Sequence, residues 1–445
     1  MKKSIIIFVF FLSVNLLSGQ SDLSFIQVDT STYRAYINND WNRIIKIGEQ
    51  AVDQQIDYYY LRLRIAYAYF KKNRFRKSIP HYRKALEYSH NDATASEFLY
   101  FCYLYSGRVN DAIKFKSSLP TPLRNYIDKR KSKTVTQFGT YLTFGNGVND
   151  NLKAEIIKTS PTTVDGSQLL PNKQFNFNSY LNHKMGSLLL VRHSINILYK
   201  DEYAQTVVNA IPYLSESQIV RQFNYSLALD ITPFYGFTIT PSVSYINYRI
   251  PVFYDYGVGL SKNRAIYTYN SFNEVAIGLN AKKQFGILET ALAVTHANFN
   301  LSKQYSMGFL LTVYPLGNLN LYYSGALFHH LQEQNSIVKT QFIHSHKVGL
   351  KVFKNMWIEG VSIFGGFTNF YDPFTQHTYN SVEKYNSILG INLVFPFSKS
   401  GRALFLGFRS YNSETMFVPV NDVFTTYNAE KIKYQSITGG ISWNF

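Results

Sequence analysis

Apolar and polar residues alternate along most of the chain from Val135 onward. In the stretch SMGFLLTVY, residues 306–314, apolar side chains occupy every second position, and glycine, serine and threonine stand at most positions between them. The stretches NEVAIGLNAK and SILGINLVF follow the same rule. Alternation of this kind is typical of strands with one apolar face. Because the other face holds small and polar residues rather than dense charge, we interpret it as the lumen side of a membrane barrel.

Fourteen segments carry this pattern, and the connections between them alternate between short and long. The short connections include HKMG, TPFYG and PLGN, whereas a long one covers residues 146–171. An even number of strands with short turns on one side is the layout of a bacterial outer-membrane barrel, whose two ends then lie on the periplasmic side. The predicted strands lie near residues 134–145, 173–184, 187–202, 217–230, 235–250, 264–283, 285–299, 303–315, 318–332, 337–353, 356–370, 382–397, 402–414 and 428–445.

Residues 30–120 have a different, helical spacing that repeats every 34 positions. Ile45 and Ile79 are 34 apart, and so are Tyr69 and Tyr103. With small and aromatic residues at matching positions, this region resembles about three tetratricopeptide repeats, in which helix pairs stack into a curved array. The resemblance implies a concave face that binds a peptide or protein, and a helical cap without a partner is the alternative. The residues assigned to packing and binding in the array are Ile65, Tyr69, Tyr82, Ala85, Tyr103 and Ala112.

The two patterns together predict a protein of the α plus membrane β-barrel class, a short tetratricopeptide-like array followed by an antiparallel barrel of about 14 strands. At the N-terminus, Lys2 and Lys3 precede an apolar run, which is the form of a secretory signal peptide. After this segment the sequence contains no run of 18 apolar residues, so we expect no membrane-spanning helix. The expected parts are a signal peptide at 1–20, a periplasmic helical domain at 21–119, a linker at 120–133 and the outer-membrane barrel at 134–445.

The chain ends in TGGISWNF, which raises the question of why a strand should stop on an aromatic residue. Thr438, Gly440, Trp443 and Phe445 resemble the C-terminal signal of outer-membrane barrels, a polar residue, a glycine and two spaced aromatics. The resemblance implies recognition by the barrel assembly machinery. It also has a physical reason, because the last strand must pair with the first to remove the sheet edges in hydrocarbon.

The chain carries a net charge of +17, with 17% aromatic residues and only 16% charged residues. A basic exported protein is attracted to anionic lipid headgroups and lipopolysaccharide, which are therefore expected partners. Nucleic acid is not expected, because the signal peptide takes the chain out of the cytoplasm. One basic run lies within the helical region, either on a solvated face or against anionic headgroups. It consists of Lys71, Lys72, Arg74, Arg76, Lys77, Arg83 and Lys84.

Ionisable residues at polar strand positions are expected to face the lumen. There they either fill the barrel with ion pairs or form a basic track for an anionic solute, and filling is the commoner role. The predicted lumen residues are Arg192, Glu274, Lys282, Lys347, Lys351 and Arg409.

Histidine is the residue type that most suggests chemistry. His329 and His330 end the ninth predicted strand, and His344 and His346 begin the tenth, so the four could meet at the outer rim. Parity instead places His329, His344 and His346 with lipid-facing residues, and we expect the histidines in the outer interfacial belt or the exposed hairpin. Ser324 with His330 is the nearest approach to a hydrolase triad. We therefore predict no catalytic residue, no metal and no cofactor.

A signal peptide, a short repeat segment and a C-terminal barrel together resemble the YaiO-type outer-membrane barrels, and more distantly the exporters of exopolysaccharide. We expect a non-enzymatic barrel whose repeat domain docks a periplasmic protein or a nascent polymer, such as a polysaccharide, beneath the lumen and supports export or passage. Two alternatives stay open. One is a structural subunit of a larger complex with a plugged lumen, and the other is a lipid- or lipopolysaccharide-modifying enzyme.

Overall fold

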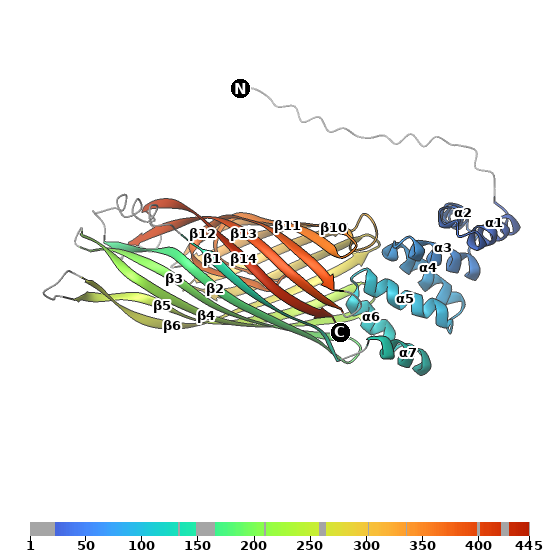
Figure 1. Ribbon diagram of the computed structural model, residues 1–445, viewed down its shortest axis with the longest axis horizontal. Coiled ribbons are helices and arrows are strands. Elements are labelled where there is room, and N and C mark those ends of the chain that lie inside the picture. Colours follow the sequence, from blue (N-terminus) through green and yellow to red (C-terminus); the bar gives the residue numbers. More distant parts are fainter. Residues whose placement is uncertain are drawn as a thin grey trace, which may run out of the picture.

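The computed structural model describes seven helices followed by fourteen strands that close into a barrel (Figure 1). The described residues are 23–131, 134–147, 165–208, 211–257, 264–300, 302–334, 336–397, 401–419 and 427–444. The helices are α1 Phe25–Ile37, α2 Trp41–Asp53, α3 Tyr59–Lys71, α4 Phe75–Tyr88, α5 Ala93–Tyr105, α6 Val109–Ser117 and α7 Thr121–Lys131. The strands are β1 Val135–Asn146, β2 Gly166–Met185, β3 Leu189–Val208, β4 Ile211–Phe234, β5 Phe237–Gly257, β6 Arg264–Phe285, β7 Leu288–Phe299, β8 Ser302–Val313, β9 Leu321–Gln334, β10 Ile337–Phe353, β11 Met356–Asp372, β12 His377–Phe397, β13 Arg402–Pro419 and β14 Tyr427–Asn444.

Each strand pairs antiparallel with its neighbour in sequence, and β1 pairs with β14 to close the barrel. At this seam Phe138 lies opposite Trp443, and Tyr141 lies opposite Gly440. Closure removes the free sheet edges, which a sheet in hydrocarbon requires. The prediction of a helical domain followed by an antiparallel 14-strand barrel is confirmed. The predicted signal peptide lies outside the described residues.

The two faces of the strands differ as the alternation predicts. On β8, Met307 exposes 66% of its surface, whereas Ser306 exposes 4%. Leu292 on β7 and Ile437 on β14 are also largely exposed, and both stand at apolar positions of the alternation. The apolar face therefore points outward, and small and polar residues point into the barrel, which is the arrangement of a barrel surrounded by lipid.

The helical domain folds as a stack of antiparallel helices. Ser24 caps α1 in a reciprocal capping box, and Asp40 and Asp92 cap α2 and α5 with their side chains. α3 packs on α2 and α4, and α5 on α4 and α6. Ile44 and Ile65 belong to one buried cluster and Tyr103 to a second, so the stack has two apolar cores along its length. Across the described ranges, no helix has both the length and the apolar character needed to cross a membrane.

The segment predicted as a linker, residues 120–133, is largely helical instead. Helix α7 occupies 121–131 and packs on α5, and Ile127 is buried in the same cluster as Tyr103. Pro122 did not prevent this helix because it stands in the first turn, where the missing N–H would have no helical partner. The last described helix therefore extends the stack toward the barrel.

Candidate functional site

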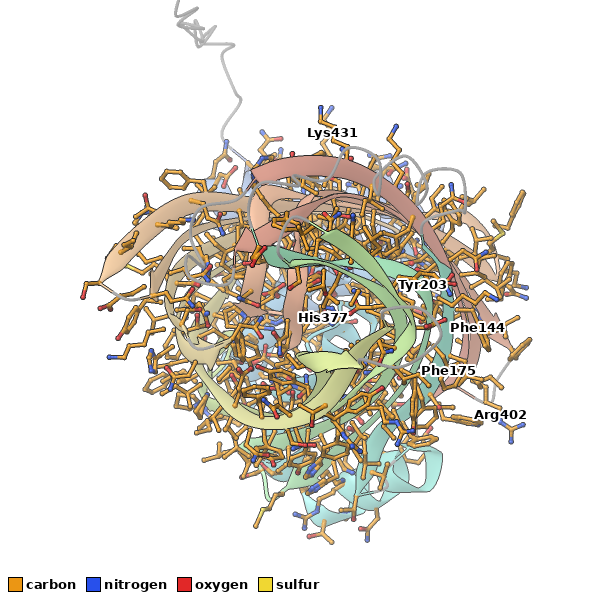
Figure 2. All side chains as sticks on the ribbon, turned by 90° about the vertical axis from the view of Figure 1, so that its left-hand side faces the viewer. Phe144, Phe175, Tyr203, His377, Arg402 and Lys431 are labelled. Atoms are coloured by element: carbon orange, nitrogen blue, oxygen red, sulfur yellow. The ribbon has the colours of Figure 1, made fainter. Side chains whose placement is uncertain are left out.

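The outer ends of β11 and β12 leave the barrel wall and fold into the lumen. The departure occurs at Gly365 and Gly366, whose φ angles of +143° and +56° favour glycine. The β11–β12 register shifts just beyond them, and β10 pairs with β11 only as far as Phe364. Figure 2 looks into the barrel from the end opposite the helices and shows His377 near its centre. We call residues 367–383 the lumen hairpin.

Hydrogen bonds from several strands hold the lumen hairpin in place. On β5, Ser242 accepts a bond from the Tyr371 hydroxyl at 3.0 Å, and the Ser244 hydroxyl lies 3.4 Å from that of Thr378. On β6, the Asn280 amide donates to the Pro373 carbonyl at 3.1 Å. Asp372 also accepts hydrogen bonds within the turn, from the Phe374 backbone and the Thr375 hydroxyl. The hairpin is therefore fixed both by its own turn and by strands distant in sequence.

An ion-paired cluster ties the hairpin to β3. The Lys200 ammonium on β3 lies 2.5 Å from a Glu383 carboxylate oxygen and 2.6 Å from one of Glu202. Glu383 is fully buried and also accepts a hydrogen bond from the Ser381 hydroxyl. Removing one partner of a buried ion pair is strongly destabilising, because the remaining charge is then buried without compensation. We call Lys200, Glu202 and Glu383 the latch.

Aromatic rings fill the space beside the hairpin. The Phe328 ring on β9 lies 4.9 Å from Phe370 and 5.3 Å from Phe374, measured between centroids. Gly308, directly opposite Phe328 on β8, leaves room for these rings, because a Cβ there would overlap Phe328. The hairpin thus lies inside the barrel and is held there by both polar and apolar contacts.

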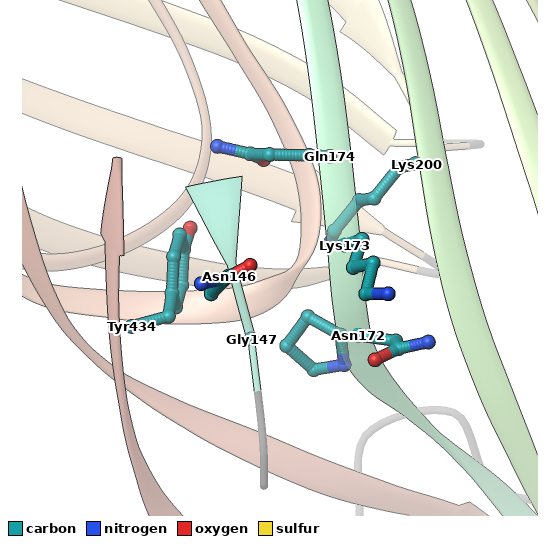
Figure 3. A pocket seen from close by; sticks show the side chains of 8 residues that line it. Asn146, Gly147, Asn172, Lys173, Gln174, Lys200 and Tyr434 are labelled. Atoms are coloured by element: carbon teal, nitrogen blue, oxygen red, sulfur yellow. The ribbon is translucent and has the colours of Figure 1, made fainter. Parts of the chain in front are cut away.

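A small recess adjoins the latch where β1 ends early. Figure 3 shows Tyr434 of β14 on one side and Lys173 and Lys200 on the other, with Asn146 at the end of β1 between them. Beyond this point β13 pairs directly with β2, at Ser167 and its neighbour. The wall is therefore irregular at its outer end, next to the buried latch.

The predicted lumen residues lie on the inner face of their strands, where most find polar partners. Arg192 pairs with Asp230 at 2.9 Å, and Lys282 lies 3.9 Å from Glu289. Glu274 accepts bonds from the Tyr248 hydroxyl and the Asn300 backbone, and Arg409 donates to Asn392. Lys351 lies over the Trp357 ring, and Lys347 stands opposite Ser324. Mixed pairs of this kind favour filling of the lumen over a continuous basic track.

The helical domain lies across one end of the barrel and contacts its short turns (Figure 1). Tyr235, in the β4–β5 turn, stacks on Tyr103 of α5 at 6.0 Å. Asp111 of α6 accepts a hydrogen bond from the Gly236 N–H at 2.7 Å, and the Lys114 ammonium donates to the Pro233 carbonyl. These contacts join the array to the barrel at a defined site.

Arg76 of α4 makes a second connection, to two other turns. It is 2% exposed, and its guanidinium lies 3.6 Å from the centre of the Tyr314 ring and 3.5 Å from the Gly286 carbonyl. Its backbone N–H also donates to the Gly317 carbonyl. The pKa of Arg76 is lowered by burial. One of the seven cations of the basic run is therefore a structural contact.

The other members of the basic run take different positions. Arg83 lies over the Tyr235 ring and Lys84 pairs with Glu87. Lys71, Lys72, Arg74 and Lys77 surround the α3–α4 turn. The run is thus divided among buried, paired and exposed positions.

The six residues predicted to pack and bind in the array all lie in its interior. Each exposes 5% or less of its surface, so they contribute packing and are not available to a partner. Exposed side chains such as Tyr33 and Tyr60, on α1 and α3, are the ones a partner could reach. The six are Ile65, Tyr69, Tyr82, Ala85, Tyr103 and Ala112.

The array should lose stability in acid. Glu49 accepts a hydrogen bond from Tyr69 and lies 3.2 Å from His81, which holds the pKa of Glu49 below its ordinary 4.5. Bonds from Arg62 likewise hold the pKa of Asp57 below 3.8. Because both pKa values are lowered on folding, the stability they add is complete above about pH 4.5 and is lost as the pH falls through the lowered values. The melting temperature of the helices, followed by circular dichroism, should be lower in acid than at neutral pH. Glu49→Gln should reduce that difference. Equal melting temperatures of the unmodified protein at the two pH values would contradict the assignment.

The histidines do not assemble into one site. His330 is fully buried in the lumen beside Ser306, and not in the predicted outer belt, because its position on β9 faces inward. His344 and His346 contact each other on the outer face of β10. Ser324 bonds Thr312 rather than His330. Within the described ranges, no three His, Cys, Asp or Glu side chains are grouped as metal ligands would be.

The C-terminal signal residues lie at the barrel seam. Thr438 shares a hydrogen bond with Thr143 on β1, and Trp443 lies opposite Phe138, with ring centroids 5.5 Å apart. Phe445 lies outside the described residues. The seam contacts explain why these residue types suit the last strand, whereas recognition by assembly machinery stays a prediction.

Several solved outer-membrane barrels resemble the chain in fold. A Pseudomonas aeruginosa FadL homologue is 5% identical over 70% of this chain and 90% of its own, with a TM-score of 0.45. The P. putida toluene transporter TodX is 7% identical over 71% and 91%, with a TM-score of 0.41, and Acinetobacter baumannii Omp33 is 11% identical over 71% and 100%, with a TM-score of 0.31. No protein-family model and no curated protein matches the chain. The similarity concerns barrel architecture alone.

Sequence reasoning missed the lumen hairpin. The strand pattern predicts a connection at residues 371–381, and it gives no special role to Lys200, Glu202 or Glu383. Two sequence features indicate the hairpin. The Gly365–Gly366 pair interrupts the alternation, and the segment that follows is rich in aromatic residues. A connection rich in phenylalanine and tyrosine is poorly suited to bulk solvent.

Proposed function

We propose that this protein is a non-enzymatic barrel of the bacterial outer membrane that supports passage through a lumen closed by the hairpin. The proposal rests mainly on the hairpin itself, which crosses the lumen and is held by the latch. The outward apolar face, exemplified by Met307, supports placement in lipid. The short turns that contact the helices support a periplasmic position for the array.

Movement of the hairpin would open the path. Much of its attachment is polar, through Ser244, Asn280 and Lys200, so water or a solute can replace these partners when the hairpin withdraws. A double glycine at its base supplies backbone freedom for such a movement. Withdrawal of the hairpin would open the lumen at the end opposite the helices.

The helical array is proposed to dock a periplasmic protein or a nascent polymer beneath the lumen. Its contacts with three short turns, through Arg76 and Tyr235, place any bound partner next to the barrel. Exposed aromatic side chains on α1 and α3, including Tyr33 and Tyr60, provide contact area. Docking would bring cargo to the inner opening.

A reversible lock tests the proposal. Ser244→Cys with Thr378→Cys should form a disulfide, because the two hydroxyls lie 3.4 Å apart. In planar bilayers, the unmodified protein should show brief openings, the oxidised double variant none, and a reductant should restore them. The Thr378→Cys single variant is the control, and native Cys102 is fully buried and cannot compete. Openings that persist in the oxidised variant would rule out the hairpin as the closure.

A further inference from the structure

Four cations gather at the α3–α4 turn. Lys71 and Lys72 end α3, Arg74 precedes α4, and Lys77 lies in its first turn. Lys71, Arg74 and Lys77 are exposed. We call the four residues the rim patch.

The described part of the chain supplies no counter-charge to the rim patch. Among the residues that the structure describes, no carboxylate lies within 4.0 Å of any of these four side-chain charges. The Lys72 ammonium donates to the neutral Asn42 amide, and Lys71 lies 5.1 Å from the Tyr67 ring centre. Arg74 and Lys77 are three positions apart, a spacing at which like charges repel. The patch is therefore a local concentration of positive charge that an external anion can neutralise.

The patch is attached to the rim of the barrel. The Asn318 amide in the β8–β9 turn donates to the Asn73 carbonyl at 2.8 Å, and the Arg74 backbone packs against Gly317. In the same turn Leu316 is 47% exposed. Leu316 follows the outward apolar face of β8, which includes Phe309. The patch thus stands where the apolar outer surface of the barrel ends.

Aromatic residues beside the patch suit the same location. Phe75 follows Arg74 and lies 5.2 Å from Tyr105 of α5, between ring centroids, and Tyr105 is 48% exposed. Amphipathic rings next to cations are typical of the headgroup region of a membrane. Charge and apolar surface therefore adjoin at one edge of the array.

We propose that the rim patch binds the headgroups of anionic phospholipid in the leaflet next to the array. This inference rests on the proposed outer-membrane placement. Lipopolysaccharide is the other anionic lipid expected of such a membrane, but it occupies the leaflet at the far end of the strands. A headgroup site at Lys71, Arg74 and Lys77 would hold the array against the rim and keep its docking surface beside the inner opening.

Lipid titration of the full-length protein in zwitterionic detergent tests the proposal, with phosphatidylglycerol and phosphatidylcholine as probes. Native mass spectrometry should show phosphatidylglycerol binding at least about tenfold more tightly, since one cation near an anionic surface contributes about fivefold. Lys71→Gln, Arg74→Gln and Lys77→Gln together should abolish the preference. The variant should also lose the rise in melting temperature that phosphatidylglycerol gives the unmodified protein.

A matched variant separates the patch from overall charge. Arg34→Gln, Arg43→Gln and Lys46→Gln remove the same charge from exposed positions on α1 and α2, and should change the preference less than about twofold. Equal loss in both variants would overturn the proposal. So would absence of a preference, or displacement of the lipid by polyglutamate, which would indicate an acidic protein instead. Failure of the barrel to insert into vesicles would count against the membrane placement, a separate result.

Discussion

Excising residues 366–385 and joining Gly365 to Asn386 through an Asn-Gly turn is expected to raise single-channel conductance at least about tenfold, because the lumen of a 14-strand barrel is wide enough for water once it is emptied. The excision removes the Phe370 and Phe374 rings and the Glu383 end of the latch together. β11 and β12 still pair between Phe364 and Ser387, so the wall is retained. Planar-bilayer recording measures the change.

The control keeps the hairpin and alters its tip. Gln376 has a φ of +60°, which glycine adopts more readily, so Gln376→Gly should leave both folding and conductance unchanged. Since excision leaves Lys200 and Glu202 without Glu383, folding of the excised barrel must be checked by resistance to proteolysis. A folded, excised barrel with unchanged conductance would show that another element closes the lumen.

Gly440→Ala is expected to destabilise the barrel by about 1–3 kcal/mol and to lower the yield of folded protein, since overpacking at a closed interface forces the backbone apart. A Cβ at this position would overlap both the Tyr141 ring and the Thr140 carbonyl of β1. The ring can turn, but the carbonyl belongs to the seam itself. The urea midpoint and the heat-dependent shift on gels measure the effect.

The neighbouring glycine provides the matched control. A Cβ added at Gly439 would meet no atom within 4 Å, so Gly439→Ala should be close to neutral. Tyr141→Ala combined with Gly440→Ala should recover part of the loss, because it removes the ring but not the carbonyl. If the two alanine variants behave alike, the seam does not depend on this close approach.

The strand pattern shows how far one sequence can predict a barrel. β10 has the predicted bounds, 337–353, because its alternation is uninterrupted and lipid demands an apolar outer face. β12 begins at His377 rather than near 382, since its first residues belong to the lumen hairpin, where neither face meets lipid. Apolar and polar residues alternate where one face of a strand meets lipid and the other meets the lumen. The alternation is lost where both faces of a strand lie inside the barrel.

The sequence by itself determined the two-part architecture, the number of strands and the outward face, because each follows from the spacing of apolar residues along a local segment. Only the tertiary structure decided that the hairpin enters the lumen, that Lys200 meets Glu383 and that Tyr235 docks on Tyr103. Those partners are more than a hundred positions apart, and their side chains would fit many surfaces. Closure of the barrel, which the terminal strand pattern does predict, brings them together, but no local pattern indicates which side chains then meet.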